Sequence, residues 1–206
     1  MRFLRKAPLS PRRLGILSGA FHPPTRAHLA LAQSALDSFQ TDEVLFVMPE
    51  TLPHKLYEHV TLRQRLEMLS AAAPGPRFSI AVAEGGLFLE IARECRAFYT
   101  TDTRLRFICG RDTAERVIAW NYSRHPPIEA QLEEFELLVA PRQGPFSPPI
   151  HLASAIDHLP VDESFDDVSS TEVRRRIAAG EDWTHLVPPA ILPLVADWYP
   201  GPPLPR

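Results

Sequence analysis

The 206-residue chain contains little cysteine, no long apolar run and no excess of positive charge. Its two cysteines, Cys95 and Cys109, lack the CxxC spacing of a redox or zinc site. No stretch reaches the about 18 uninterrupted apolar residues of a membrane-spanning helix, and the first residues hold no apolar export signal. The formal net charge of −3 argues against a protein that wraps nucleic acid. We therefore expect a cytoplasmic protein without a membrane segment or a nucleic-acid partner.

The composition that is present predicts one compact domain. With 45% hydrophobic and 23% charged residues, the chain can bury a substantial core. We place this single domain at residues 14–198. The preceding residues 1–13 are rich in arginine and are expected to form a flexible basic arm. The following residues 199–206, with the sequence YPGPPLPR, are expected to be a loose tail.

Short apolar runs alternate with segments of helical periodicity along the domain. This alternation predicts an α/β fold of the Rossmann-like type, an open parallel sheet with helices on both faces. In such a sheet, ligands bind at the carboxyl ends of the strands, so the loops after the first and fourth runs should lie together. The predicted strands are 14–18, 43–48, 78–82, 105–109 and 135–140, and two C-terminal helices are expected at 170–179 and 189–198.

Two stretches at opposite ends of the chain have the features of a phosphate site. GAFHPPTRAH (19–28) and SSTEVR (169–174) each open a predicted helix, and a helix N-terminus offers free N–H groups and a positive dipole end to an anion. Thr25 and His28, three positions apart, can face the same ligand. The structural alternative is that Thr25 caps the helix and His28 packs against the sheet. From this loop alone, both readings stay open.

Arg174 favours the ligand reading. An arginine in the first helical turn opposes the helix dipole, at a cost of about 0.3 to 1 kcal/mol, unless an anion lies there. Ser169 and Glu172 have the spacing of a capping box, which explains them structurally. Arg175 and Arg176 are expected to be solvated. Together the two stretches predict that the bound anion is the triphosphate of a nucleotide.

The same two stretches resemble the G-x-F-x-P-x-(H/T)-x-x-H and I-S-S-T-x-I-R signatures of the HxGH superfamily of nucleotidyltransferases. Three segments between them are similar to segments of bacterial nicotinate mononucleotide adenylyltransferases: VMPETLPHK (47–55), LRQRLEML (62–69) and FICGRDTAERVIAW (107–120). ELLVAPRQG also matches that family's strand before an R-P-G turn. The likeness covers residues 14–198, nearly the whole chain.

The resemblance implies a role for each matching residue. The catalytic residues would be Thr25, His28 and Arg174, and Lys55 and Trp120 would bind the acceptor, with Trp120 stacking on its pyridine ring. Loop backbone and the second motif would hold the ATP phosphates, and the turn after the fourth strand would meet the ribose. The ATP-binding set is Gly19, Ala20, Phe21, Gly110, Asp112, Ser170, Thr171 and Arg174.

The implied reaction transfers the adenylyl group of ATP to nicotinate or nicotinamide mononucleotide, which forms the dinucleotide and releases pyrophosphate in NAD biosynthesis. Positioning and charge neutralisation supply the catalysis, so no nucleophilic side chain is needed. Mg²⁺ would be bound mainly through the ATP phosphates, and we name no protein metal ligand. The partners would be ATP and a pyridine mononucleotide, and a homo-oligomer is possible.

One segment departs from the family. EGGLFLE (84–90) stands where the bacterial enzymes carry S-Y-T-x-D-T-L, the segment that recognises the nicotinate carboxylate. The choice between nicotinate and nicotinamide mononucleotide therefore stays open, as does another phosphorylated acceptor such as a phosphopantetheine or sugar-phosphate compound. A nucleotide-binding regulator that has lost catalysis is a third hypothesis, against which the presence of Thr25, His28 and Arg174 argues.

Overall fold

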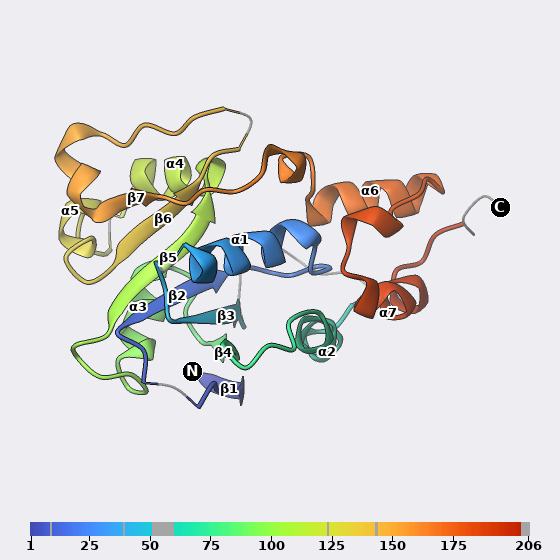
Figure 1. The fold of residues 1–206 in the computed structure, drawn as a ribbon, viewed down its shortest axis with the longest axis horizontal. Coiled ribbons are helices and arrows are strands. Elements are labelled where there is room, and N and C mark those ends of the chain that lie inside the picture. The colour runs from blue at the N-terminus through green and yellow to red at the C-terminus, as the bar shows by residue number, and fades with distance from the viewer. Residues whose placement is uncertain (9, 39, 51–59, 123, 143, 203–206) are drawn as a thin grey trace.

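The computed structural model describes residues 1–8, 10–38, 40–50, 60–122, 124–142 and 144–202. Their centre is a seven-stranded sheet with the order β1-β4-β3-β2-β5-β6-β7 (Figure 1). Every neighbouring pair runs parallel except the edge pair of β1 and β4. The strands are β1 (Arg2–Arg5), β2 (Arg13–Ser18), β3 (Glu43–Pro49), β4 (Phe78–Ala83), β5 (Arg104–Gly110), β6 (Glu136–Ala140) and β7 (Ile156–His158).

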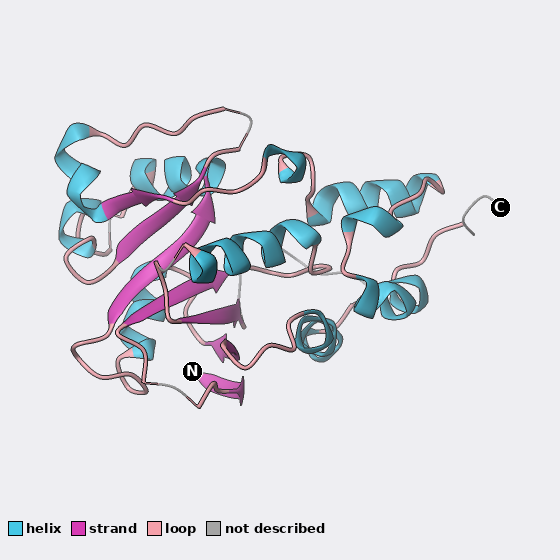
Figure 2. Ribbon diagram, viewed as in Figure 1, coloured by secondary structure: helices cyan, strands magenta, loops and turns pink. Residues whose placement is uncertain are grey.

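Helices cover both faces of this sheet, as Figure 2 shows. The α-helices are α1 (Arg26–Asp37), α2 (Leu62–Ala72), α3 (Phe88–Cys95), α4 (Arg111–Ala119), α5 (Ile128–Gln131), α6 (Ser170–Ala179) and α7 (Leu192–Trp198). Short 3-10 turns are η1 (Ile150–Ala155), η2 (Glu163–Phe165), η3 (Thr184–Leu186) and η4 (Pro189–Ile191). The predicted Rossmann-like fold is confirmed.

The alternation of side chains along the strands builds a separate core on each face. Ile16 and Phe107 pack with residues of α3 and α4 in one cluster, whereas the neighbouring Leu17 and Ile108 pack with α1 in the other. This is the two-sided burial expected of strands in a parallel sheet. It explains why the strands are nearly continuous apolar runs in the sequence.

A third cluster joins the C-terminal helices to α2. Met68 of α2, Val173 and Ile177 of α6 and Val195 of α7 are all buried in it. Figure 1 shows α6 and α7 beside α2, at the end of the molecule away from β7. The C-terminal segment is thus fixed to the domain by an apolar core of its own.

Residues at both ends that were predicted to be flexible make defined contacts in the structure. Residues of the basic arm form β1, in which Phe3 pairs with Ala81 and packs on the Phe98 ring, with the ring centroids 5.1 Å apart. The apolar Phe3 anchors this end to the sheet, a contact that the arginine-rich composition of the end does not predict. At the other end, Tyr199 is buried. Residues 203–206 lie outside the described residues.

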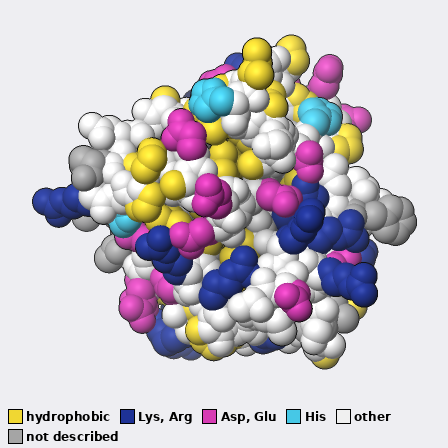
Figure 3. All heavy atoms as spheres, turned by 90° about the vertical axis from the view of Figure 1, so that its left-hand side faces the viewer, with side chains coloured by type: hydrophobic (Ala, Val, Ile, Leu, Met, Phe, Trp, Pro, Cys, Tyr) yellow, Lys and Arg dark blue, Asp and Glu magenta, His cyan; other side chains and the backbone are white. Residues whose placement is uncertain are grey.

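The face turned toward the viewer in Figure 3 carries basic and acidic side chains next to one another. Within the part of the chain that the structure describes, no helix is long and apolar enough to cross a membrane.

The close approach of β2 to its neighbours makes a testable prediction at Gly15. A methyl group there would lie 2.9 Å from both Ile108 Cδ1 and Thr41 Cγ2, so we expect Gly15→Ala to lower the free energy of unfolding by about 1 to 3 kcal/mol. Urea denaturation measures this loss. Gly110→Ala is the control, because its methyl group would meet nothing closer than Arg142 Cδ at 3.9 Å. Equal stabilities of the two variants would contradict this packing.

Candidate active site

The two predicted phosphate-binding stretches meet at the carboxyl ends of the central strands. Residues 19–24, here called the phosphate loop, connect β2 to α1. The N-terminus of α6 lies against this loop, since Ser170 Oγ donates a hydrogen bond of 2.7 Å to the carbonyl oxygen of Pro23. Gly110 ends the neighbouring strand β5 and begins α4. Both loops predicted from the strand order are therefore on the same edge of the sheet.

The phosphate loop has a defined shape at its start. The Gly19 N–H donates to the carbonyl oxygen of Val47 at 3.0 Å. Phe21 has a φ of 45°, a left-handed conformation that costs a residue other than glycine about 1 to 2 kcal/mol. Its ring is 1% exposed and packs edge-on against Phe46, at 5.7 Å between centroids. Burial of this ring offsets the backbone strain.

Arginines behind the loop bind its carbonyl oxygens. Arg65 Nη1 of α2 donates to the Ala20 oxygen at 2.9 Å, and Arg174 Nη1 of α6 donates to the His22 oxygen at 2.6 Å. In a trans peptide the N–H points away from the carbonyl, so the bond to Ala20 turns the Phe21 N–H toward the opposite side. The loop thus directs its acceptors into the protein and leaves a donor for an anion.

Thr25 and His28 contact each other directly. His28 Nδ1 lies 3.0 Å from the Thr25 backbone nitrogen and 2.7 Å from Thr25 Oγ1. A backbone N–H can only donate, so Nδ1 is the acceptor and the neutral ring carries its proton on Nε2. Thr25 is also the N-cap residue of α1. Thr25 therefore stands at the N-cap position, which the sequence offered as an alternative, and it also orients the His28 ring.

The half-buried position of His28 and a nearby charge keep its ring neutral. Burial lowers the pKa of the imidazole to about 4, and the positive charge of Arg142 lowers it as well. The ring is thus neutral at pH 7, with an Nε2–H donor and no formal charge of its own.

Arg174 differs from the two arginines that follow it. Its Nη1 also lies 3.1 Å from the Ser170 oxygen and its Nη2 lies 3.4 Å from Thr171 Oγ1, so it spans the loop and the start of α6. Arg175 and Arg176 both bond the Glu172 carboxylate, at 2.8 and 2.7 Å. Both side chains reach solvent as predicted, 51% and 31% exposed, and helical spacing in addition brings them over Glu172.

Ser169 caps α6 as predicted, since its Oγ accepts the Glu172 N–H at 3.1 Å.

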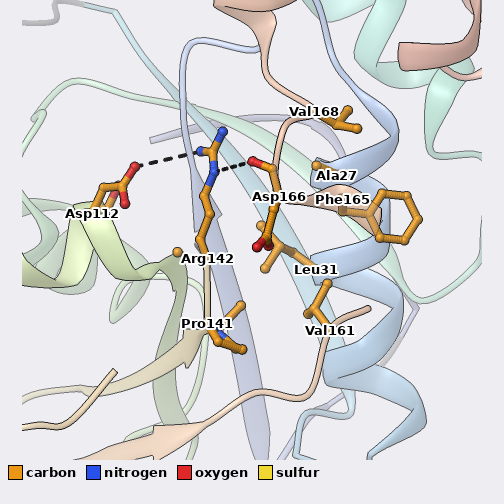
Figure 4. A pocket seen from close by; sticks show the side chains of 12 residues that line it. Ala27, Leu31, Asp112, Pro141, Arg142, Val161, Phe165, Asp166 and Val168 are labelled. Atoms are coloured by element: carbon orange, nitrogen blue, oxygen red, sulfur yellow. Dashed lines mark hydrogen bonds and ion pairs between the residues drawn. The ribbon is translucent and has the colours of Figure 1, made fainter. Parts of the chain in front are cut away.

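A pocket of about 90 Å³ lies between the ends of β5 and β6, the start of α1 and the segment before α6 (Figure 4). We call it the β5–β6 pocket. Apolar side chains from α1 and from residues 161–168 line one part of it, and Asp112 and Arg142 line another. Its lining includes Ala27, Leu31, Gly110, Thr113, Val161, Phe165 and Val168.

Arg142 is a residue that the sequence reasoning missed. Its Nε donates to the Asp166 carbonyl at 2.8 Å and its Nη1 lies 4.0 Å from Asp112 Oδ2, so it lies between the two in Figure 4. The sequence signals it by its place two residues after a predicted strand, within ELLVAPRQG, where a cation reaches the ligand edge of the sheet.

Trp120 lines a second pocket, of about 180 Å³, which we call the Trp120 pocket. Trp120 is 46% exposed at the end of α4. Thr113 lines both pockets, so they are neighbours. The remaining lining residues are Gly86, Leu87, Phe88, Arg116, Val117 and Tyr122. The segment that departs from the family pattern therefore borders this pocket.

Lys55, predicted to lie on the acceptor side, falls outside the described residues. Among the residues that are described, no group of at least three His, Cys, Asp or Glu side chains could hold a metal ion.

The fold and the paired motifs define a nucleotidyltransferase. A family model described as cytidylyltransferase-like matches residues 16–176, and the chain belongs to this family. It is 32% identical over 188 residues to a probable nicotinate-nucleotide adenylyltransferase of Thermus thermophilus, covering 87% of this chain and 94% of the relative. A relative of the same name from Citrifermentans bemidjiense is 29% identical over 207 residues, with 87% and 93% covered.

Solved structures agree with the fold. Plasmodium falciparum nicotinic acid mononucleotide adenylyltransferase complexed with NaAD matches with a TM-score of 0.72, covering 90% of this chain and 95% of that one, at 14% identity. A likeness at this identity supports the architecture alone.

The depressed pKa of His28 predicts a pH effect on stability. The folded ring binds its proton only near pH 4, whereas the unfolded ring binds one near pH 6.5. The unfolded state therefore holds more protons between these values, and stability is lost as the pH falls from about 6.5 toward 4. We expect His28 to account for a loss of about 2 kcal/mol between pH 7 and pH 5.

Urea denaturation at both pH values measures this loss. His28→Asn should reduce the difference between the two pH values by that amount, whereas His151→Asn, a change at an exposed histidine, should keep it. The same pH dependence in the wild-type protein and His28→Asn would contradict a lowered pKa of the His28 ring.

Proposed function

We propose that the protein transfers the adenylyl group of ATP to nicotinate mononucleotide, or its nicotinamide counterpart, in NAD biosynthesis. The observation that carries the proposal is the contact between the two motifs. Arg174 bonds the His22 carbonyl of the phosphate loop at 2.6 Å, and the loop leads into α1, which carries a half-buried, neutral His28. The relatives named above support the choice of acceptor class.

The triphosphate would bind on the free side of the phosphate loop. The Phe21 N–H and the N-termini of α1 and α6 offer donors and positive dipole ends there. Arg174 keeps N–H groups beyond those that bond His22 and Ser170, and these would contact the β and γ phosphates. Ser170 and Thr171 would complete this end of the site.

His28 would donate its Nε2–H to an oxygen of the reacting α-phosphate. A neutral, fixed donor strengthens as negative charge develops in the transition state and needs no reorganisation. The positive charge of Arg142 would add long-range stabilisation, since it is close enough to His28 to lower that ring's pKa. Thr25 would keep the imidazole in the required tautomer through its contacts to Nδ1.

The β5–β6 pocket would hold the adenosine. Leu31, Val161 and Phe165 provide apolar surface for a purine, and the pocket opens beside Ala27, one residue from His28. Gly110 allows close approach at the ribose, and the Asp112 carboxylate can accept hydrogen bonds from its hydroxyl groups.

The acceptor would lie in the Trp120 pocket, with its pyridine ring against the indole. An oxygen of its 5′-phosphate attacks the α-phosphorus, a new phosphorus–oxygen bond forms, and the bond to the bridging oxygen of the β-phosphate breaks as pyrophosphate leaves. Mg²⁺ would neutralise phosphate charge when bound. The loop supplies N–H donors and α6 supplies the Arg174 cation, so the phosphates and water would be the main metal ligands.

The segment 84–90 bears on which pyridine is preferred. Glu90 Oε2 accepts the N–H groups of Gly86 and Leu87 at 2.9 and 3.0 Å, so a carboxylate of the chain already occupies these donors. Arg116 is the basic residue that lines the Trp120 pocket. We propose that Arg116 recognises the nicotinate carboxylate in this chain. Acceptor binding by Lys55, assembly into a homo-oligomer and a cytoplasmic location stay predictions.

Pyrophosphate release from Mg-ATP, with nicotinate and nicotinamide mononucleotide offered separately, tests the reaction. We expect turnover with nicotinate mononucleotide and a loss of about a hundredfold or more in kcat for His28→Ala, the scale of losing one transition-state donor. Bound ATP that persists with both mononucleotides would instead favour another phosphorylated acceptor or a regulator. Near-normal turnover by His28→Ala would remove the role given to His28.

Arg116→Gln and Trp120→Ala separate the acceptor contacts. We expect Arg116→Gln to raise KM for nicotinate mononucleotide about tenfold or more, because a charge-assisted bond is lost, and to leave KM for nicotinamide mononucleotide and ATP unchanged. Trp120→Ala should raise KM for both mononucleotides. Equal effects of Arg116→Gln on the two acceptors would exclude carboxylate recognition by Arg116.

A further inference from the structure

The phosphate loop has one more partner, which comes from the end of the described chain. Tyr199 follows α7 directly, and its hydroxyl lies 2.6 Å from His22 Nδ1, although 177 positions separate the two residues. The two rings are 5.1 Å apart at an interplanar angle of 43°. Both residues are 7% exposed. The contact therefore joins the C-terminal segment to the centre of the loop in a site largely closed to water.

The position of Tyr199 is itself well determined. Its N–H donates to the Val195 carbonyl at 3.0 Å, which continues the hydrogen bonding of α7 by one residue. Its ring belongs to the apolar cluster of α2, α6 and α7. The hydroxyl is thus held in place by the core that surrounds its ring.

The tyrosine lies among the groups that bind the loop carbonyls. Burial raises the pKa of its hydroxyl, and the charges of Arg174 and Arg65 lower it in part. The hydroxyl therefore keeps its proton at neutral pH. Arg65, Arg174 and Tyr199 together surround the stretch Ala20 to His22 from behind, and Tyr199 is the member that reaches a side chain of the loop instead of its backbone.

His22 needs such a partner because of its surroundings. A buried ring nitrogen without a hydrogen bond is costly. The neighbouring Phe21 has the left-handed φ of 45°, so the loop keeps its form only while its contacts hold. Loss of the Tyr199 contact would loosen His22, the residue whose carbonyl Arg174 binds.

We propose that Tyr199 is a positioning residue for the triphosphate, acting through His22 to hold the phosphate loop in its binding form. The proposal rests on the adenylyl transfer proposed above. It assigns a role in ATP binding to the stretch that follows α7, which carries none of the motif residues.

Tyr199→Phe tests the proposal because it removes only the hydroxyl. We expect kcat/KM for ATP to fall about tenfold, the scale of one lost buried hydrogen bond, with KM for nicotinate mononucleotide unchanged within about twofold. A merely structural tyrosine would lower the melting temperature and leave this ratio unchanged. That result would overturn the proposal.

A double-mutant cycle with His22 locates the effect. Once His22→Ala has removed the partner, adding Tyr199→Phe should change kcat/KM for ATP by less than about twofold. His22→Asn, which places a hydrogen-bonding atom near the former Nδ1, should recover activity relative to His22→Ala only when Tyr199 is present. Additive losses from the two residues would contradict action through His22.

Val195→Ala is the matched structural control, since Val195 is fully buried in the same cluster. It should lower the melting temperature without changing the ratio for ATP. Calorimetric measurement of Mg-ATP binding distinguishes a failure of the proposed reaction from a failure of the positioning role of Tyr199. If the wild-type protein binds ATP without releasing pyrophosphate, the proposed reaction fails, and tenfold weaker binding by Tyr199→Phe would still support the positioning role.

Discussion

The bond between the Arg174 guanidinium and the His22 carbonyl is the interaction on which the site depends. It spans 152 positions of the chain and joins α6 to the phosphate loop at 2.6 Å. A charge-assisted bond of this kind is strong where water is excluded. Its geometry requires α6 to be fixed, and the apolar cluster shared by α2, α6 and α7 provides that support. Core packing far from the sheet thus determines the arrangement of the phosphate-binding groups.

In this site, the hydrogen-bond donor beside the reacting phosphate and the positive charges come from different residues. His28 is neutral at pH 7 because partial burial and the charge of Arg142 lower its pKa, so it supplies a directed hydrogen bond. Arg174 at the loop and Arg142 at the β5–β6 pocket supply positive charge. Such a division suits phosphoryl chemistry, in which positioning and charge neutralisation do most of the catalysis. It also leaves no need for a nucleophilic side chain.

Much of the fold was predictable because its strands are buried on both faces. The runs 14–18 and 105–109 became β2 (Arg13–Ser18) and β5 (Arg104–Gly110), each within one residue at either end. β1 and β7 were missed, since one lies in a basic terminus and the other, Ile156–His158, is too short to show a period. Hydrophobic periodicity and residue propensity do not predict a short strand that forms because it can pair with the edge of a sheet.

Site residues could be predicted where their position in the local sequence, such as the start of a helix, itself suggests a function. Thr25, His28 and Arg174 stood out by their places at helix starts, and the structure brings them to the same loop. Arg142 and Tyr199 could not be found in this way, because their importance comes from long-range packing that no spacing records. The pairing of Arg175 and Arg176 with Glu172 was within reach of helical spacing and was overlooked.

Binding of Mg-ATP to Arg174→Ala, measured by calorimetry beside Arg175→Ala, tests the central claim most directly. Arg175 lies one residue further along α6 and pairs with the carboxylates of Glu172 and Glu181, so it controls for loss of charge on the same helix. The account predicts that Arg174→Ala binds ATP at least about tenfold more weakly, the scale of a lost charge-assisted bond, while Arg175→Ala binds it as the wild-type protein does. Equal ATP affinity in Arg174→Ala and the wild-type protein would contradict it.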